Sequence, residues 1–300
     1  MAGVQPILHL TPLDTRYPSR LRFLARPPAS ISVGGALPEA AHAIAIVGSR
    51  ASTSEAEGFA YALAGALVRA GAVVVSGGAQ GIDAAAHRGA LDARGRTWAV
   101  AGTGCEHCFP PEHASLFEAI ARGPGAMIWP FSPDSAARPG AFVLRNRVLV
   151  ALSDAVVVAQ AGSNSGALRA AACARALRKP LWAVPAPPWA IGFEGSRQLL
   201  AEGVRPLTSI DAFVLALEMT KGLRRESSPE VEACAPEGLD PIQSKVLRAT
   251  SSSPLHVERI AEQAHVTLQA AAAALLTLAL EAVLVEGPPG FFRRPDSYKR

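Results

Sequence analysis

The sequence has 300 residues, of which 49% are hydrophobic and 18% are charged. This composition excludes a chain that is disordered over most of its length, and the length allows one large core with a small satellite domain. The 29 basic and 25 acidic residues leave a formal net charge of +4, which permits an anionic partner without requiring one.

The N-terminal stretch, MAGVQPILHLTPLD, has no basic segment followed by a long apolar one, and no apolar run approaches the roughly 20 residues that a membrane-spanning helix needs. The four cysteines are too few and too scattered for a disulfide framework. We therefore expect a cytoplasmic protein with reduced thiols and no membrane association.

Residues 1–41 are expected to be an N-terminal lead-in segment. From about residue 42, short apolar runs alternate with turns and amphipathic stretches, as in a parallel sheet covered by helices. The predicted strands are nearly continuous apolar runs, which is typical of strands buried on both faces. They are Ala43–Val47, Ala72–Val75, Thr97–Ala101, Ala126–Trp129, Ala155–Ala159 and Leu181–Val184.

Amphipathic stretches between these runs predict helices near 54–70, 83–93, 111–122, 146–152, 165–178, 195–202 and 209–219. The first is expected to begin with Ser52 and Glu55 in capping-box spacing and to end at Gly71. Residues 42–219 therefore predict an α/β domain, a Rossmann-like doubly wound parallel sheet. Ligands of such sheets bind beyond the carboxyl ends of the strands.

Residues 220–238 lose the apolar periodicity and gain Glu, Ser and Pro, which predicts a linker. Residues 239–300 then predict a small winged-helix domain: three short helices and an apolar hairpin, with Asp240 and Pro241 opening the first helix and Thr267 capping the third. This domain holds seven Lys or Arg and six Asp or Glu residues. We therefore expect it to bind a partner, or a duplex only weakly.

The strongest local motif is VVVSGGAQGIDAAAHRGAL, residues 73–91. A buried strand ends, three glycines allow close backbone approach, and a helix begins, so free N–H groups and the positive helix end favour a phosphate there. The candidate residues are Ser76, Gly77, Gly78, Gly81, Ile82 and Asp83. The spacing matches neither a dinucleotide nor an NTP fingerprint. The alternative is a tight turn with Asp83 as a helix cap.

Two further turns follow predicted strands. IVGSR supplies Gly48, Ser49 and Arg50, and GSNSGAL supplies Ser165 and Gly166. Neighbouring parallel strands would bring these loops to the same crevice, adding hydroxyl, N–H and guanidinium donors. The alternatives are a solvated loop arginine and ordinary turn propensity.

The motif AFVLRNR places Phe142, Arg145, Asn146 and Arg147 immediately before a predicted helix. Two arginines beside an aromatic ring suit a nucleic-acid strand, because guanidinium groups bind phosphates and a ring face stacks on a base. The alternative is a pair of surface salt bridges with the phenylalanine in the core.

Signals for catalysis or metal binding are weak. Cys105, His107, Cys108 and His113 include a C-x-x-C, but no second such pair completes a zinc site. His87 stands four residues after Asp83 on the same predicted helix, and we expect a structural hydrogen bond between them. We expect no catalytic residues, no metal and no cofactor.

Taken in order, the motifs resemble the DNA-processing protein A (DprA/Smf) family, whose Rossmann-like domain binds single-stranded DNA. The matching stretches are VGSR, SGGAQGIDAAAHRGAL, GRTWAVAGTG with FPPEH, FVLRNRVLVALSDAVVVAQAGSNSGAL and LWAVPAP, with a weaker match in YPSRLRFLARPPASISVGG. The resemblance covers about residues 11–215, and many members also carry a C-terminal winged helix.

The resemblance implies a single-stranded DNA-binding crevice that includes Ser49, Arg50, the loop from Ser76 to Asp83, the 142–147 motif and Gly166. It also implies a role in DNA uptake, natural transformation and recombination, with protection of incoming DNA, loading of the RecA recombinase, and a homodimer. The chain departs from the family at Gln80, Trp129, Pro130, Gln160, Arg169 and Arg197.

The alternative function is a nucleoside monophosphate phosphoribohydrolase of the related Rossmann-like superfamily. Those enzymes use a glutamate in a PGGxGTxxE motif, which this sequence lacks. Gln160, which follows the fifth predicted strand, supplies no titratable group for acid–base catalysis. We therefore expect a binding protein and not an enzyme.

Overall fold

The computed structural model describes residues 6–37, 42–217, 240–251, 254–280, 283–287 and 290–294. The described residues divide into two compact units, each considered by itself below. The first lies within Met1–Thr11 and Ser30–Glu226, and the second within Pro12–Ala29 and Ser227–Arg300. The predicted linker, 220–238, lies outside the described residues.

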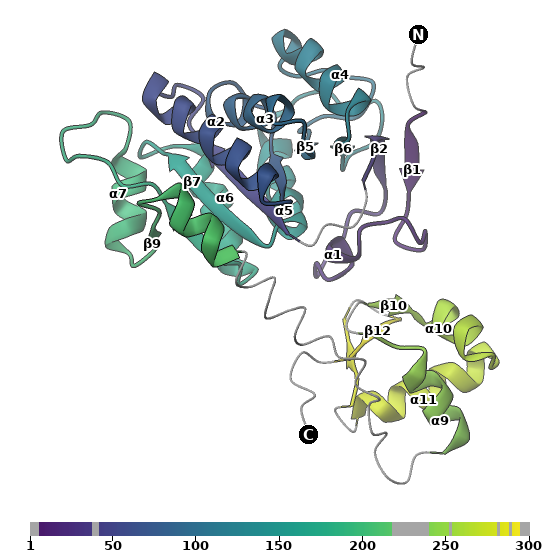
Figure 1. Ribbon diagram of the computed structural model, residues 1–300. Helices are drawn as coiled ribbons and strands as arrows, with labels where there is room; N and C mark the ends of the chain where they lie inside the picture. Colours follow the sequence, from purple (N-terminus) through teal and green to yellow (C-terminus); the bar gives the residue numbers. More distant parts are fainter. Residues whose placement is uncertain are drawn as a thin grey trace. The chain divides into compact units, whose positions relative to one another are not determined.

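The first unit is built on a nine-stranded sheet with the strand order β1-β2-β6-β5-β4-β3-β7-β8-β9 (Figure 1). The strands are β1 (Leu8–Leu10), β2 (Ile31–Gly35), β3 (Ala43–Gly48), β4 (Val73–Ser76), β5 (Thr97–Val100), β6 (Ala126–Trp129), β7 (Ala155–Gln160), β8 (Leu181–Ala183) and β9 (Arg205–Pro206). All pairings from β6 to β9 are parallel.

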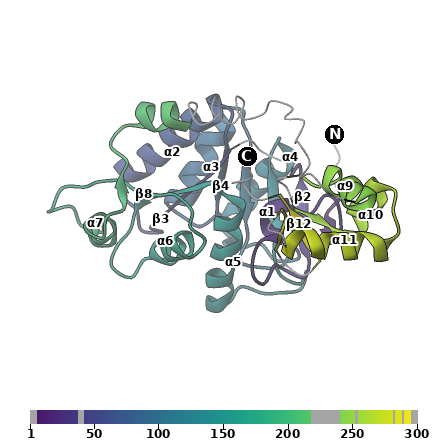
Figure 2. The same cartoon turned by 90° about the horizontal axis from the view of Figure 1, so that it is seen from below.

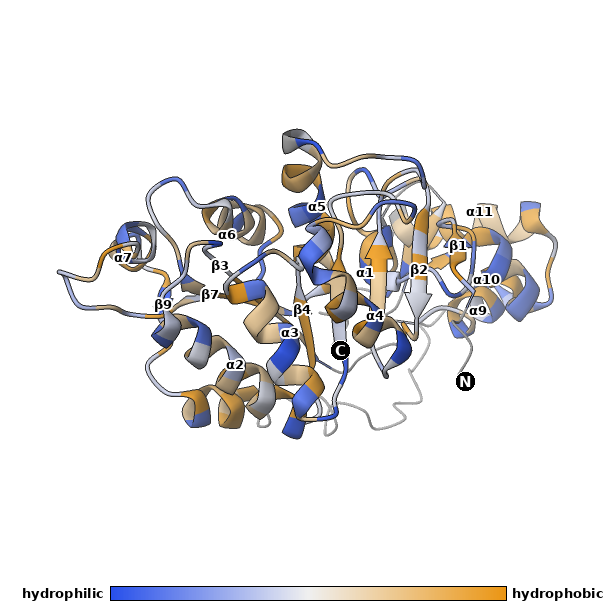
Figure 3. Ribbon diagram, turned by 90° about the horizontal axis from the view of Figure 1, so that it is seen from above, coloured by the Kyte–Doolittle hydropathy of each residue, from blue (hydrophilic) through white to orange (hydrophobic). Residues whose placement is uncertain are grey.

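The six predicted strands are all present, within one or two residues of their expected ends. The lead-in segment adds β1 and β2, which the sequence analysis did not predict: β2 pairs antiparallel with β6, and β1 pairs antiparallel with β2. The central strands are buried along their length, as continuous apolar runs require. Figure 3 shows β4 in the apolar colours.

Helices cover both faces of this sheet, with α2, α3 and α4 on one face and α5 and α6 on the other (Figure 2). The elements are α2 (Ser54–Arg69), α3 (Ile82–Asp92), the 3₁₀ turn η1 (Pro111–His113), α4 (Ala114–Arg122), α5 (Pro139–Leu152), α6 (Gly166–Ala176) and α7 (Glu194–Ala201). Residues 210–217 are also helical. This arrangement confirms the doubly wound α/β fold.

Two helix starts differ from the prediction. The cap of α2 is Thr53, whose hydroxyl accepts from the Ala56 N–H, whereas the Ser52 hydroxyl donates to Glu57 at 2.7 Å. The predicted helix at 146–152 begins seven residues earlier, at Pro139, because a proline is well tolerated in the first turn. The 142–147 motif therefore lies within α5 and not before it. Gly71, at φ 78°, ends α2 as expected.

The second unit contains the expected winged helix. Its helices are α9 (Pro241–Arg248), α10 (Val257–Ala264) and α11 (Leu268–Leu280), and its small sheet has the order β10-β12-β11, from Leu255–His256, Phe291–Arg293 and Val285–Glu286. Asp240 forms a capping box with Gln243 at the start of α9. The Thr267 hydroxyl accepts from the Ala270 N–H, which confirms the predicted cap.

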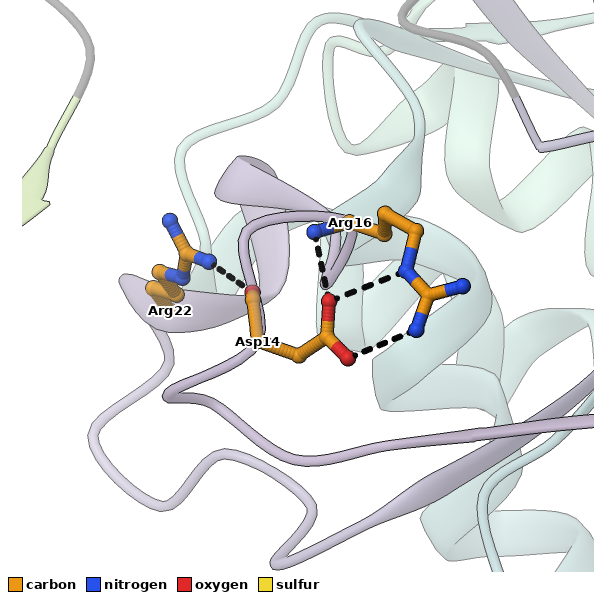
Figure 4. Close-up of polar contacts among 3 residues, drawn as sticks. All are labelled: Asp14, Arg16 and Arg22. Carbon is orange, nitrogen blue, oxygen red and sulfur yellow. Dashed lines mark hydrogen bonds and ion pairs between the residues drawn. The ribbon is translucent and has the colours of Figure 1, made fainter.

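The segment Pro12–Ala29 carries a short helix, α1 (Ser19–Arg22), preceded by a turn that contains Asp14 and Arg16 (Figure 4). The Asp14 carboxylate accepts from the backbone and the guanidinium of Arg16, which lowers the pKa of Asp14. Arg22 donates to the Asp14 carbonyl oxygen at 2.6 Å. Two arginines, Arg16 and Arg22, therefore stabilise the turn by donating hydrogen bonds to Asp14.

Among the helices of the described residues, none is long and apolar enough to cross a bilayer.

Candidate nucleic-acid interface

A crevice of about 840 Å³ opens at the carboxyl edge of the sheet, where the loops after β3 and β7 meet. β3 lies between β4 and β7, so the chain order reverses here, which is the usual ligand position in doubly wound sheets. The predicted site residues that line it are Gly48, Ser49, Arg50, Asp83, Phe142, Arg145, Asn146, Ser165 and Gly166. An adjoining pocket of about 170 Å³ shares Arg50, Phe142 and Arg145 with the crevice.

In the glycine loop after β4, backbone N–H groups form hydrogen bonds within the protein. The N–H groups of Gly77 and Ala79 donate to the Asp83 carboxylate at 3.2 and 3.3 Å, and that of Ile82 donates to the Ser49 carbonyl oxygen. Three amides that we expected to be free for a phosphate are therefore occupied. Asp83 is not a simple cap of α3, because its side chain reaches back to hold the loop.

Tight packing explains the glycines of this loop. Gly78 and Gly81 have φ of 72° and 74°, and a side chain at Gly81 would meet the Ser49 carbonyl oxygen at 2.5 Å. Ile82 is fully buried, and the buried Ser76 hydroxyl donates to the Ile46 carbonyl oxygen. These predicted site residues shape the floor of the crevice and do not line it.

Arg145 is a buried brace with only 5% of its surface exposed. Its guanidinium donates to the carbonyl oxygens of Gly77 and Val100 at 2.5 and 2.6 Å. It also faces Asp83, where burial raises the carboxyl pKa while the guanidinium charge opposes that rise. The arginine thus ties α5 to the ends of β4 and β5.

The other members of the 142–147 motif diverge because they lie on one helix. Asn146 is buried at the crevice wall and donates to the Gly166 carbonyl oxygen at 3.4 Å. Arg147 lies outside the crevice, on the side of α5 toward Cys173. Burial raises the pKa of the Cys173 thiol, and the charge of Arg147 partly offsets that rise. The structure therefore does not bring Arg145 and Arg147 to the same ligand.

Two aromatic rings, Phe109 and Phe142, line both the crevice and the adjoining pocket. The Phe142 ring packs against Phe109 with centroids 5.5 Å apart, and the Arg50 guanidinium lies 5.2 Å from the Phe142 centroid. Phe109 is 39% exposed. This pair presents a partly exposed apolar surface beside a cation.

Other residues that line the crevice were not predicted from the sequence, and they include Phe109, Arg138, Arg169 and Glu194. Arg138 and Arg169 are exposed, as is Arg50, so three solvent-accessible guanidinium groups line the crevice. Arg169 follows the Ser165 cap by one helical turn, which was the available signal. Glu194 comes from α7, and no local pattern connects it to the other loops.

The titratable and amide groups nearby are used structurally. Gln160 is buried, and its side-chain oxygen accepts from the Thr53 N–H at 2.9 Å. His87 was expected to form a hydrogen bond with Asp83, but its Nδ1 is hydrogen-bonded to the Thr97 hydroxyl at 2.7 Å instead. Burial lowers the pKa of His87 to about 3, so its ring is neutral.

The residues of the C-x-x-C region have other partners. His113 donates to the Gly78 carbonyl oxygen at 2.9 Å, and His107 donates to that of Asp134. Across the described residues, no three His, Cys, Asp or Glu side chains gather as metal ligands.

Comparison with known proteins places this geometry in a family. Residues 8–218 match the model for DNA recombination-mediator protein A, and residues 230–288 match that for the DprA winged helix domain. The chain belongs to the DNA-processing protein A (DprA/Smf) family. The two matches cover the sheet of the first unit and the winged helix of the second.

Individual DprA/Smf relatives align over different lengths. A putative DNA processing protein DprA of Mycobacterium tuberculosis is 41% identical over 175 residues, which are 58% of this chain and 45% of that protein. Protein Smf of Escherichia coli is 30% identical over 295 residues, 96% of this chain and 78% of that protein. The chain thus spans under half of the first relative's length.

Two solved structures share the fold. DNA processing protein A of Helicobacter pylori, studied for its single-stranded DNA binding mode, superposes with a TM-score of 0.65 at 27% identity, covering 71% of this chain and 96% of that one. The Streptococcus pneumoniae DprA structure gives 0.64 at 29% identity, covering 71% and 75%.

Proposed function

We propose that this DprA/Smf member binds single-stranded DNA in the crevice at the carboxyl edge of its sheet. One observation carries the proposal: the exposed guanidinium groups of Arg50, Arg138 and Arg169 line the same crevice as the Phe109–Phe142 pair. Guanidinium groups neutralise phosphates, and ring faces stack on bases. An extended strand needs both.

This chemistry recognises the backbone more than the sequence. Contacts to phosphates position a strand without reading its bases, and stacking accepts any base. The buried Arg145 supports the site indirectly, because it holds Gly77 and Asp83 in place. We therefore expect similar affinity for oligonucleotides of different sequence.

The biological role that we propose is the one the family resemblance implies. The protein would act in the cytoplasm during DNA uptake and recombination, protect incoming single strands, load the RecA recombinase and form a homodimer. Two findings support the DNA part: the matched model describes a recombination mediator, and the Helicobacter pylori relative binds single-stranded DNA.

Binding without catalysis is the second part of the proposal. Gln160 stands at the end of β7, and because its side-chain amide is not titratable, it cannot act there as a general acid or base. Incubation of the purified protein with nucleoside monophosphates should release no free base. Measurable release that scales with protein concentration would instead favour a phosphoribohydrolase.

The deciding experiment is the binding of labelled oligothymidine, followed by fluorescence anisotropy at two salt concentrations. The Arg50→Ala variant should bind several-fold more weakly than the unmodified protein. Arg122→Ala is a matched control, because it removes the same charge from a residue that pairs with Glu118 on α4. Salt-independent binding, or equal losses in both variants, would contradict the proposed site.

A further inference from the structure

The loop between β8 and α7, residues 184–193, carries the two most exposed large apolar side chains of the described residues. Trp189 is 81% exposed and Ile191 is 87% exposed. Figure 2 shows this loop extending away from the sheet. Two large apolar side chains this exposed, two positions apart in one loop, form an apolar surface that a partner can cover.

The tryptophan does not sit on a loose loop. The Ala190 N–H donates to the Pro187 carbonyl oxygen at 3.0 Å, which closes a turn around Trp189. One nitrogen of Arg197, Nη1, then donates to the carbonyl oxygens at both ends of that turn, Pro187 at 3.2 Å and Ala190 at 2.9 Å. A single guanidinium from α7 therefore holds the turn in shape and presents the ring outward.

The base of the loop is fixed to the crevice. The backbone of Ser196 donates to the Ala161 carbonyl oxygen at 3.0 Å, and the Ala161 N–H donates to the Ser196 hydroxyl at 2.9 Å. Glu194 and Gly162, on these same two segments, both line the crevice. The Trp189 loop is thus rooted at the end of the crevice formed by the β7 and β8 loops.

Charge at this end favours a base over a phosphate. Backbone hydrogen bonds from its own N–H and from the Gly192 N–H at 3.1 Å lower the pKa of Glu194, and the charge of Arg197 at 3.7 Å lowers it further. Glu194 and Arg197 offset each other's charge, so this end of the crevice offers a phosphate no net attraction. A strand leaving the crevice here would turn its phosphates away and present its bases to the loop.

We propose that Trp189 is a stacking platform that extends the interface for single-stranded DNA beyond the crevice, with Arg197 as the residue that positions it. This inference rests on the proposed function. The turn that carries the ring is formed before binding, so stacking a base on Trp189 does not have to order the loop backbone, and less of the stacking free energy is lost.

The test measures the affinity of the full-length protein for oligothymidines of increasing length. Trp189→Ala should bind the shortest oligomers as the unmodified protein does, but bind long ones about tenfold more weakly, within the range expected for a lost stack. Trp189→Phe should keep most of the affinity because it keeps a ring. Ile191→Ala, an equally exposed aliphatic truncation, is the matched control and should change little.

A photo-crosslink locates the contact directly. Oligonucleotides with one 5-bromouracil at successive positions should crosslink to Trp189 from positions near one end only. Arg197→Ala should reduce this crosslink and the affinity for long oligomers while Trp189 is still present.

Each failure has a distinct reading. If the unmodified protein binds oligothymidine but Trp189→Ala matches it at every length, the platform is wrong and the crevice proposal stands. If Trp189→Ala alters only self-association in sedimentation, the ring serves a protein contact and the platform is again wrong. If the unmodified protein binds no oligothymidine, the proposed function itself fails.

Discussion

At the scale of single residues, Arg50 and Arg145 have opposite roles in one crevice. Arg145→Ala should lower the free energy of unfolding by about 2–4 kcal/mol, because it leaves two carbonyl oxygens without their charged donor and removes the positive charge that opposes the raised pKa of Asp83. Arg50→Ala should change stability by less than about 0.5 kcal/mol, because its side chain is exposed. Urea unfolding measures both.

A second substitution separates the effect of the lost charge from the effect of the lost packing in Arg145→Ala. Adding Asp83→Asn to Arg145→Ala removes the uncompensated carboxylate, so the double variant should recover part of the lost stability. An Arg145→Ala protein that unfolds at the same urea concentration as the unmodified protein would show that the brace is unimportant.

The lowered pKa of His87 makes the free energy of unfolding depend on pH. Its folded-state pKa of about 3 lies below the unfolded value of 6.5, so only the unfolded chain takes up a proton between these values. Its contribution is therefore lost as pH falls below about 6.5, and by pH 5 the loss should reach about 2 kcal/mol. His87→Gln should flatten this part of the pH profile. An unchanged slope in the variant would assign the effect to other groups.

Two arginines of α5 show what a sequence pattern cannot contain. Arg145 and Arg147 have the same chemistry and neighbouring positions, yet one is buried among carbonyl oxygens and the other lies outside the crevice. Burial depends on what packs against α5 from distant segments. Glu194 joins the site in the same way, through Ala161 and Ser196, which are 35 residues apart.

At the scale of elements, the start of α2 gives a direct test of capping. Thr53→Ala should destabilise the protein by about 1 kcal/mol, because the Ala56 N–H loses its acceptor. Ser52→Ala is the neighbouring control and should cost less, because the Ser52 hydroxyl donates to a side chain and not to the helix backbone. Thermal unfolding compares the two, and a larger loss for Ser52 would restore it as the cap.

The elements that could be predicted are those whose pattern is purely local. Continuous apolar runs in the sequence predict the buried parallel strands, and Gly71 predicts the end of α2. β2 was missed because ISVGG ends in two glycines and gains its partner, β6, only through the fold. The start of α5 was missed because Pro139 and Gly140 read as breakers, although proline is well tolerated in a first turn.

At the scale of the whole molecule, local charge and net charge make different predictions for DNA binding. A net charge of +4 spread over 300 residues gives a weak overall field. By contrast, Arg50, Arg138 and Arg169 are concentrated along one crevice. If all three neutralise phosphates, the logarithm of the binding constant should fall with the logarithm of salt concentration with a slope of about −2.

Two double variants with the same net charge decide between these readings. Arg50→Ala with Arg169→Ala should reduce the slope to about −0.7, because one crevice contact remains. Arg122→Ala with Arg175→Ala lowers the net charge by the same amount. These two arginines do not line the crevice, and each forms an ion pair of 2.6 Å, with Glu118 and Glu202 respectively, so the slope should stay near that of the unmodified protein. Equal slopes in the two double variants would mean that DNA responds to the overall charge, and the crevice arginines would then not be its phosphate contacts.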